Sequence, residues 1–230
     1  MKQNKYFIIV KESGVFLSFF TYIYLITLPL LALSQLIIGQ QSWLSMLILF
    51  IGNVIYIGFL VAYFRKSLVS EWKVFRANYS KIIDISITWW FIGVVGMALS
   101  NYLISTFLPG ATPTNQELIE ANIFRFPLYM AFATIIFAPL VEELIFRKLL
   151  RRIFSSTWLF VAASTVTFGL CHVITSASSL HDFALFVPYA VLGFTFAMTY
   201  VKTKSIYGPI FTHAFHNGLL FAILYIGHIL

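Results

Sequence analysis

The chain has 230 residues, of which 60% are apolar, 10% are charged and 25 are phenylalanine. Soluble globular domains carry roughly 25% charged and about 45–50% apolar residues. This composition, with a mean hydropathy of +0.90, therefore excludes an ordinary soluble domain and predicts a single transmembrane domain over residues 1–230. The net charge of +7 does not indicate a nucleic-acid partner, because the basic residues are spread over many connections and form no single stripe.

Seven long apolar stretches follow one another along the chain. About 20 helical residues are needed to cross about 30 Å of hydrocarbon, and lipid offers no hydrogen-bond partner to a non-helical backbone. The stretches are about 14–38, 43–64, 82–108, 126–149, 157–175, 182–201 and 206–229. We therefore expect an all-α polytopic bundle of about seven membrane helices. The segment 109–125 is expected to be an external cap, or to hold a short re-entrant eighth piece.

The basic residues divide the connections between these stretches into two sets. All of the 15 lysines and arginines except Arg125 lie before the first stretch, after the second or the sixth, or at the end of the fourth and directly after it. Short basic loops stay on the cytoplasmic side of a membrane. The pattern predicts a multi-pass protein of the cell membrane with its N-terminus in the cytoplasm.

Two adjacent glutamates interrupt the fourth stretch, in the sequence Glu142-Glu143-Leu144-Ile145-Phe146-Arg147. An ionisable group within a membrane helix costs about 2.5–3.5 kcal/mol on insertion scales, so such residues usually have a function. Glu143 and Arg147 are four residues apart and can pair on one helical face, whereas Glu142 points about 100° away. A plainer interpretation is that both glutamates only neutralise the basic cluster at the end of this helix.

Two later stretches carry histidines that could meet these carboxylates, although a single membrane histidine most often only bonds one helix to another. With a turn near Thr157, Glu142 and His172 are each fifteen residues from the turn. An antiparallel helix pair would then place them at the same height. His213 and Asn217, in the last stretch, share one helical face. The three helices can therefore converge on one cavity.

These side chains have the chemistry of a peptide-hydrolysis site. A buried carboxylate beside an imidazole is a plausible general-base pair for water, which is the candidate role of Glu142 and His172. An imidazole N–H and an amide NH₂ can stabilise a developing oxyanion, which is the candidate role of His213 and Asn217. Arg147 would then hold Glu143 in an ion pair beside the site.

Three ordered motifs resemble those of the CPBP family, the CAAX-processing and bacteriocin-processing (Abi) intramembrane proteases. The motifs are Glu142-Glu143-x-x-x-Arg147, Phe168-x-x-x-His172 and His213-x-x-x-Asn217, within a catalytic core at residues 126–220. The resemblance implies that Glu142 is the general base and that His172 positions the water. It implies that His213 and Asn217 stabilise the oxyanion. The remaining motif residues would support the site structurally: Glu143, Arg147 and Phe168.

The resemblance leaves the cofactor and the substrate open. The family has also been described as zinc proteases, and one glutamate with two histidines could form a three-ligand zinc site. Because the chain has no His-Glu-x-x-His helix, the usual zinc-protease pattern, we favour catalysis without a metal. The implied partners are membrane lipids and a peptide or protein substrate, lipidated or membrane-embedded. The implied roles are peptide maturation, signalling or bacteriocin immunity.

Two other classes of function stay open on the sequence alone. The first is a non-catalytic immunity or scaffold protein that binds a partner within the bilayer. The second is a small proton-coupled transporter that uses the glutamates as a relay. Transport folds often show inverted repeats and paired broken helices, which the sequence does not display, so we favour the peptidase.

Overall fold

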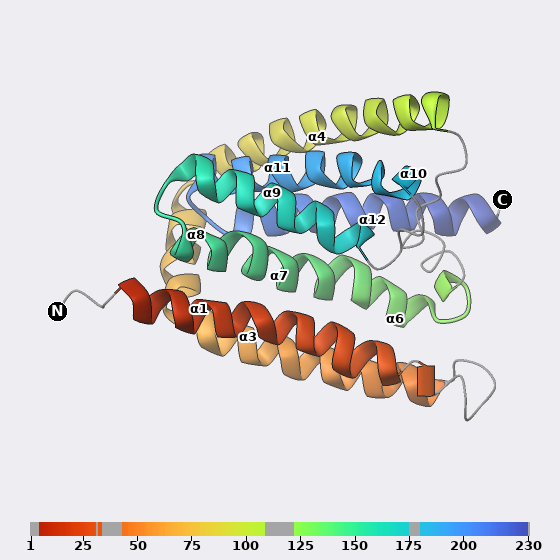
Figure 1. Ribbon diagram of the computed structural model, residues 1–230, viewed down its shortest axis with the longest axis horizontal. Coiled ribbons are helices and arrows are strands. Elements are labelled where there is room, and N and C mark those ends of the chain that lie inside the picture. Colours follow the sequence, from red (N-terminus) through yellow and green to blue (C-terminus); the bar gives the residue numbers. More distant parts are fainter. Residues whose placement is uncertain (1–4, 31, 34–42, 109–121, 175–179, 230) are drawn as a thin grey trace.

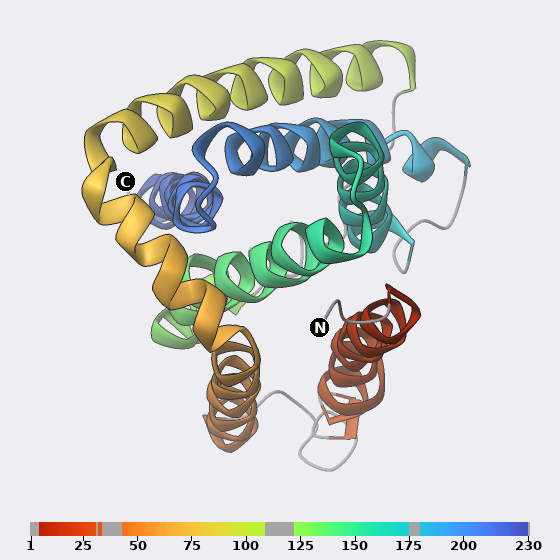
Figure 2. The same cartoon turned by 90° about the vertical axis from the view of Figure 1, so that its left-hand side faces the viewer.

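The computed structural model describes residues 5–30, 32–33, 43–108, 122–174 and 180–229, and all regular structure in these ranges is helical. The elements are α1 (Lys5–Phe20), η1 (Thr21–Thr27), α3 (Trp43–Ala77), α4 (Tyr79–Phe107), α6 (Pro127–Ala131), η2 (Phe132–Phe137), α7 (Ala138–Glu143), η3 (Leu144–Leu149), α8 (Leu150–Ile153), α9 (Thr157–Val173), α10 (Leu180–Phe183), α11 (Phe186–Thr203) and α12 (Tyr207–Ile229). The three η segments are π-helical. The long helices run in a similar direction in the view of Figure 1, whereas Figure 2 shows α12 nearly end-on and α4 running across the view. The predicted all-α bundle is confirmed.

Five helical stretches are long and apolar enough to cross a membrane. They are Tyr6–Leu30, Trp43–Ala77, Tyr79–Phe107, Pro127–Ile153 and Tyr207–Gly227. These helices make the chain a multi-pass membrane protein. The fourth of them runs without a break from α6 to α8, and we call it the glutamate helix.

The other two predicted spans correspond to α9 and α11, which are not among the helices that are long and apolar enough to cross a membrane. The apolar helix α9 has only 17 residues. The helix α11 carries buried threonines at positions 195, 199 and 203, and it is enclosed by α4, α9, α12 and the glutamate helix (Figure 2). A helix buried by protein on all sides need not be as apolar as one that faces lipid, because neighbouring helices satisfy its polar groups.

The ends of the first two helices differ from the prediction. Helix α1 begins at Lys5, and α3 continues to Ala77 instead of ending near residue 64. Residues 65–77 include no proline or glycine, so nothing stops the helix before Ala77. Helix α3 is about 52 Å long at 1.5 Å per residue, and its second half crosses one end of the bundle (Figure 2). The predicted basic loop is therefore largely helical.

Some predictions concern residues outside the described ranges. The proposed cap or re-entrant piece falls mostly on 109–121, and the predicted end of the first span falls on 34–38. The orientation with a cytoplasmic N-terminus stays a prediction, since it depends on a membrane as well as on the fold.

Phenylalanine rings fill the space between the helices and carry the packing toward the motif residues. The ring of Phe146, on the glutamate helix, makes edge contacts with Phe19 of α1 at 5.6 Å and with Phe168 of α9 at 5.6 Å between centroids. Edge-to-face contacts at this distance are favourable beyond the area that they bury. The abundance of phenylalanine thus builds a core that extends from α1 to the site.

Candidate active site

The glutamate helix is widened on both sides of its two glutamates. The π-helical segments η2 and η3 flank the six-residue α7, which ends at Glu143. Single π turns within α-helices are frequent at functional sites. Pro139 in the first turn of α7 has no N–H to donate, so the ordinary ladder of hydrogen bonds is also interrupted here.

The structure brings Glu142, His172 and His213 together, as the spacing predicted. The Oε2 atom of Glu142 is 3.9 Å from Nε2 of His172 and 3.9 Å from Nε2 of His213. The side chains of Glu142 and His172 retain 17% and 16% exposure, and that of His213 retains 5%. Two imidazoles from different helices therefore face one carboxylate oxygen in a largely desolvated setting.

The other ring nitrogen of each histidine has a fixed partner. Nδ1 of His172 is 2.8 Å from the Phe168 carbonyl oxygen, and Nδ1 of His213 is 2.9 Å from Oε1 of Glu143. A carbonyl or carboxylate oxygen accepts, so each Nδ1 carries the proton. In the neutral rings, the lone pairs on both Nε2 atoms then point toward Glu142. The hydrogen bonds thus fix the tautomers as well as the ring positions.

Arg147 lies fully buried behind this group. Its Nη1 is 3.1 Å from Oε1 of Glu143, and its Nη2 donates to the Gly193 carbonyl at 3.1 Å. Its guanidinium carbon is 4.5 Å from the ring centroid of Phe168 and 5.3 Å from that of Phe196. The predicted pair of Glu143 and Arg147 is present, and the same glutamate oxygen also contacts the imidazole of His213.

The basic cluster after Arg147 is neutralised from elsewhere. The ammonium of Lys148 pairs with Glu71 of α3, and Nη1 of Arg152 is 3.1 Å from Oε1 of Glu12 of α1. The plainer interpretation of the two glutamates therefore does not account for Glu142, which pairs with none of these cations within the described residues. Its ion-pair-range neighbours there are the two histidines.

Asn217 lies one helical turn beyond His213, and its amide is hydrogen-bonded to the glutamate helix. Its Nδ2 donates to the Thr134 carbonyl at 2.9 Å. The Ala138 N–H bonds to the Ala133 carbonyl, and the next residue is Pro139, so the π-helical register leaves the Thr134 carbonyl without a backbone donor. Asn217 supplies the missing donor. Its second amide hydrogen is the one that an oxyanion could use.

The sequence analysis missed the contribution of α11. Gly193 accepts the Arg147 hydrogen bond, and a Cβ added to it would lie 3.2 Å from Phe168 and 3.3 Å from the Thr165 carbonyl. A glycine inside an apolar helix pattern is a recognised sign of close backbone approach, and it was the available signal. Phe196 carried no signal, because the chain has 24 other phenylalanines.

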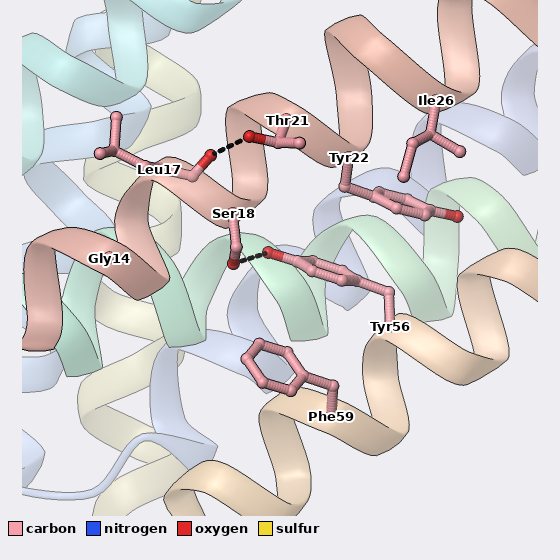
Figure 3. A pocket seen from close by; sticks show the side chains of 8 residues that line it. All are labelled: Gly14, Leu17, Ser18, Thr21, Tyr22, Ile26, Tyr56 and Phe59. Atoms are coloured by element: carbon pink, nitrogen blue, oxygen red, sulfur yellow. Dashed lines mark hydrogen bonds between the residues drawn. The ribbon is translucent and has the colours of Figure 1, made fainter.

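A pocket of about 500 Å³ lies elsewhere, between α1 and α3 (Figure 3). Ser18 and Tyr56, whose hydroxyls are 3.1 Å apart, are among the residues that line it. None of the motif residues is among them. This pocket therefore has no part in the arrangement around Glu142.

The residues around Glu142 fit a zinc ion in type but only loosely in spacing. Zinc-bound histidines usually donate their other N–H to a carboxylate or carbonyl, as both do here. Ligand atoms about 2.0–2.1 Å from a tetrahedral zinc lie about 3.3 Å apart, whereas the separations here are 3.9 Å. Within the described parts of the chain, no group of three or more histidine, cysteine or acidic side chains is arranged to hold a metal ion.

Comparisons with known proteins agree with the motifs. Residues 124–219 match the family model described as type II CAAX prenyl endopeptidase Rce1-like. The chain is 30% identical over 153 residues to the "Putative membrane peptidase YdiL" of Bacillus subtilis (strain 168), an alignment that covers 63% of this chain and 59% of the relative. It is 29% identical over 133 residues to the "Membrane-embedded CAAX protease MroQ" of Staphylococcus aureus (strain USA300), an alignment that covers 54% of this chain and 50% of the relative.

A third relative is the "UPF0177 protein YbdI" of Lactococcus lactis subsp. lactis (strain IL1403), 27% identical over 149 residues, with 61% of this chain and 78% of the relative covered. The chain thus spans 59% and 50% of the length of the first two relatives. No solved structure matches it significantly. The segment that matches the family model contains all three motifs, so residues 124–219 are similar to this family of membrane endopeptidases.

Proposed function

We propose that the chain is an intramembrane endopeptidase that hydrolyses peptide bonds with a water molecule activated by Glu142. One observation carries the proposal: Nε2 of His172 and Nε2 of His213 face the same oxygen of Glu142 at 3.9 Å. That separation is too long for a direct hydrogen bond, but it suits one water oxygen held between the carboxylate and an imidazole.

The proposed reaction begins with this water. Its oxygen attacks the scissile carbonyl carbon while its proton passes to Glu142, and His172 holds the water through Nε2. The carbonyl oxygen becomes an oxyanion that accepts hydrogen bonds from His213 and Asn217. When the carbon–nitrogen bond breaks, Glu142 returns the proton to the leaving amine. The products are a peptide with a new carboxyl group, which keeps the second proton of the water, and a peptide with a new amino group.

The proposed oxyanion role of His213 needs a proton on its Nε2, because its Nδ1 proton is engaged by Glu143. The ring would then be an imidazolium at the moment of reaction. The Glu143 carboxylate, 2.9 Å away, would stabilise that charge, and the same carboxylate oxygen is 3.1 Å from Nη1 of Arg147. The ion pair of Glu143 and Arg147 would therefore support the oxyanion donor His213 as well as the packing of the helices.

The depth of the site suggests how its substrate is presented. Glu142 lies eleven residues before the end of the stretch Pro127–Ile153, about 16 Å along the helix. A peptide bond would reach this depth most easily on a membrane-embedded or lipid-linked chain. We propose such peptides or protein tails as the substrate class, with peptide maturation, signalling or bacteriocin immunity as the settings.

Mass spectrometry of peptides released in liposomes tests this function. Wild-type protein is expected to release peptides with new carboxyl ends, and Glu142→Gln is expected to release none although it inserts normally. Asp84→Asn, an exposed carboxylate on α4, is the matched control and should behave as wild type. Unchanged cleavage by Glu142→Gln would contradict the proposal and favour a non-catalytic protein.

The metal question has a separate arm in the same assay. If a zinc ion were held by Glu142, His172 and His213, it would polarise the substrate carbonyl and activate the water. We favour the metal-independent reaction, so cleavage should be unchanged after prolonged exposure to a chelator. Loss of cleavage with the chelator and its return with zinc would show that the metal is required.

A further inference from the structure

Helix α11 carries two aromatic rings that lie against the two imidazoles of the site. The ring of Tyr189 stacks on His172, with 4.5 Å between centroids and 23° between planes. The ring of Phe196 stacks on His213 at 4.7 Å and 22°. Tyr189 and Phe196 are seven residues apart, which is about two helical turns, so both project from the same face of α11.

The stacking restrains a motion that the hydrogen bonds leave free. The bond at Nδ1 fixes the tautomer of each histidine but allows its ring to tilt about that bond. A ring stacked on one face opposes the tilt, because aromatic pairs prefer defined offsets and angles. A second ring also contacts His172, since the Phe168 ring lies 4.5 Å away at 38°. Together these contacts aim Nε2 at Glu142.

The approach of α11 is itself made possible by glycine. Gly193 lies between the two aromatic residues on this face, and its lack of a side chain lets Phe168 pack against the helix. On α9, a Cβ added to Gly169 would lie 2.7 Å from the ring of Phe186, at the start of α11. Both glycines bring α11 close to the helix that carries His172.

We propose that Tyr189 and Phe196 are positioning residues, which hold the imidazoles of His172 and His213 in the orientation that faces Glu142. The claim that the two rings hold the imidazoles depends only on the ring contacts. The claim that this orientation matters for catalysis rests on the proposed peptidase function. Neither residue belongs to the three motifs. The ring of Tyr189 acts in this role, and its hydroxyl does not.

The test compares leucine and aromatic substitutions at the half-buried Tyr189. Tyr189→Leu removes the stacked ring, and kcat for peptide release is expected to fall roughly tenfold, with an upper limit near the ~100-fold that misplacing a catalytic group by about 1 Å can cost. KM should change little, because the substrate contacts remain. Tyr189→Phe keeps the ring and should restore kcat. Phe194→Leu, a ring on the same helix that contacts Trp89, is the matched control and should match wild type.

A second readout needs no activity. Histidine ¹³Cε1–¹H signals of the protein in micelles report ring currents from stacked neighbours. Tyr189→Leu should shift the His172 signal and spare that of His213, while Phe196→Leu should do the reverse. The Phe194→Leu control should move neither signal.

The outcomes separate the inference from the function on which it rests. If Tyr189→Leu leaves both kcat and the His172 signal at wild-type values, the positioning role is wrong. If Tyr189→Phe is as slow as Tyr189→Leu, the hydroxyl acts and the stacking proposal is also wrong. If Glu142→Gln still cleaves, the proposed peptidase fails, and the histidine signals alone still decide whether the rings are held by stacking.

Discussion

At the scale of single residues, the two adjacent glutamates have different surroundings because their side chains leave the helix about 100° apart. Glu142 keeps partial exposure and faces two imidazoles, whereas the side chain of Glu143 has none and contacts both Arg147 and His213 through one oxygen. The proposed function gives Glu142 the role of general base. The other carboxylate is held between a buried cation and a histidine, where its charge balances the guanidinium.

Glutamine substitutions should therefore separate stability from activity. Glu143→Gln leaves the fully buried Arg147 without its counter-charge, and removing one partner of a buried ion pair costs about 3–5 kcal/mol. Glu142→Gln breaks no such pair. Its free energy of unfolding, measured by thermal unfolding in detergent, should match that of wild type within about 0.5 kcal/mol, while peptide cleavage is lost. Unfolding curves with equal shifts for the two variants would show that the two carboxylates are not divided in this way.

Asn217 has a structural contact and a proposed catalytic role, and a double variant can divide them. Asn217→Ala removes the donor to the Thr134 carbonyl, which should cost about 1 kcal/mol as the net value of one hydrogen bond, and it removes the proposed oxyanion donor. Pro139→Ala returns a backbone N–H to this turn. Adding it to Asn217→Ala should recover part of the lost stability and leave kcat low.

One outcome would contradict the proposed catalytic role of Asn217. If the double variant recovers both stability and kcat, Asn217 only positions the glutamate helix. The oxyanion would then need another donor.

At the scale of helices, the glutamate helix is held at its basic end by carboxylates from the first two spans. Glu71 of α3 pairs with Lys148, and its other oxygen accepts from the Ile206 N–H at 2.7 Å, directly before α12. An acidic side chain at a helix N-terminus satisfies a free donor and interacts favourably with the helix dipole. A single residue of α3 thus joins the helix of Glu142 to the helix of His213.

Glu71→Gln should consequently loosen two helices at once. The charge pair with Lys148 is lost, and the neutral amide is a weaker acceptor for the Ile206 N–H. We expect a loss of about 2–4 kcal/mol in unfolding free energy, since Lys148 is left buried without its counter-charge. Adding Lys148→Met should recover much of the loss. If the double variant is no more stable than Glu71→Gln, the cap on α12 outweighs the ion pair.

The sequence predicted the helices well and their limits less well. Length and apolarity fix where a helix must cross lipid, so each of the seven stretches contains a helix among its described residues, but nothing in them reveals that α3 continues for thirteen residues beyond Phe64. The meeting of Glu142, His172 and His213 followed from residue spacing and hairpin symmetry. The π turns and the α11 contacts depend on packing between helices, which spacing along one helix does not encode.

At the scale of the whole molecule, one end of the bundle is basic and the other is not. Exposed cations of α3, α4 and α11 gather where the second half of α3 crosses the helix ends, including Lys73, Lys81 and Lys202 (Figure 2). The positive-inside rule predicts that this end faces the cytoplasm. The site lies about 16 Å from the same end along the glutamate helix, so the orientation decides from which half of the bilayer a substrate approaches.

Cysteine labelling in intact cells tests this orientation. Lys202→Cys lies at the basic end, and Phe107→Cys, at a side chain that is 73% exposed, lies at the opposite end of α4. A membrane-impermeant maleimide should label Phe107→Cys from outside and should label Lys202→Cys only after the cells are opened. Wild-type protein supplies the background from the half-buried Cys171. The reverse pattern would invert the bundle, and a substrate would then reach Glu142 from the outer half of the bilayer.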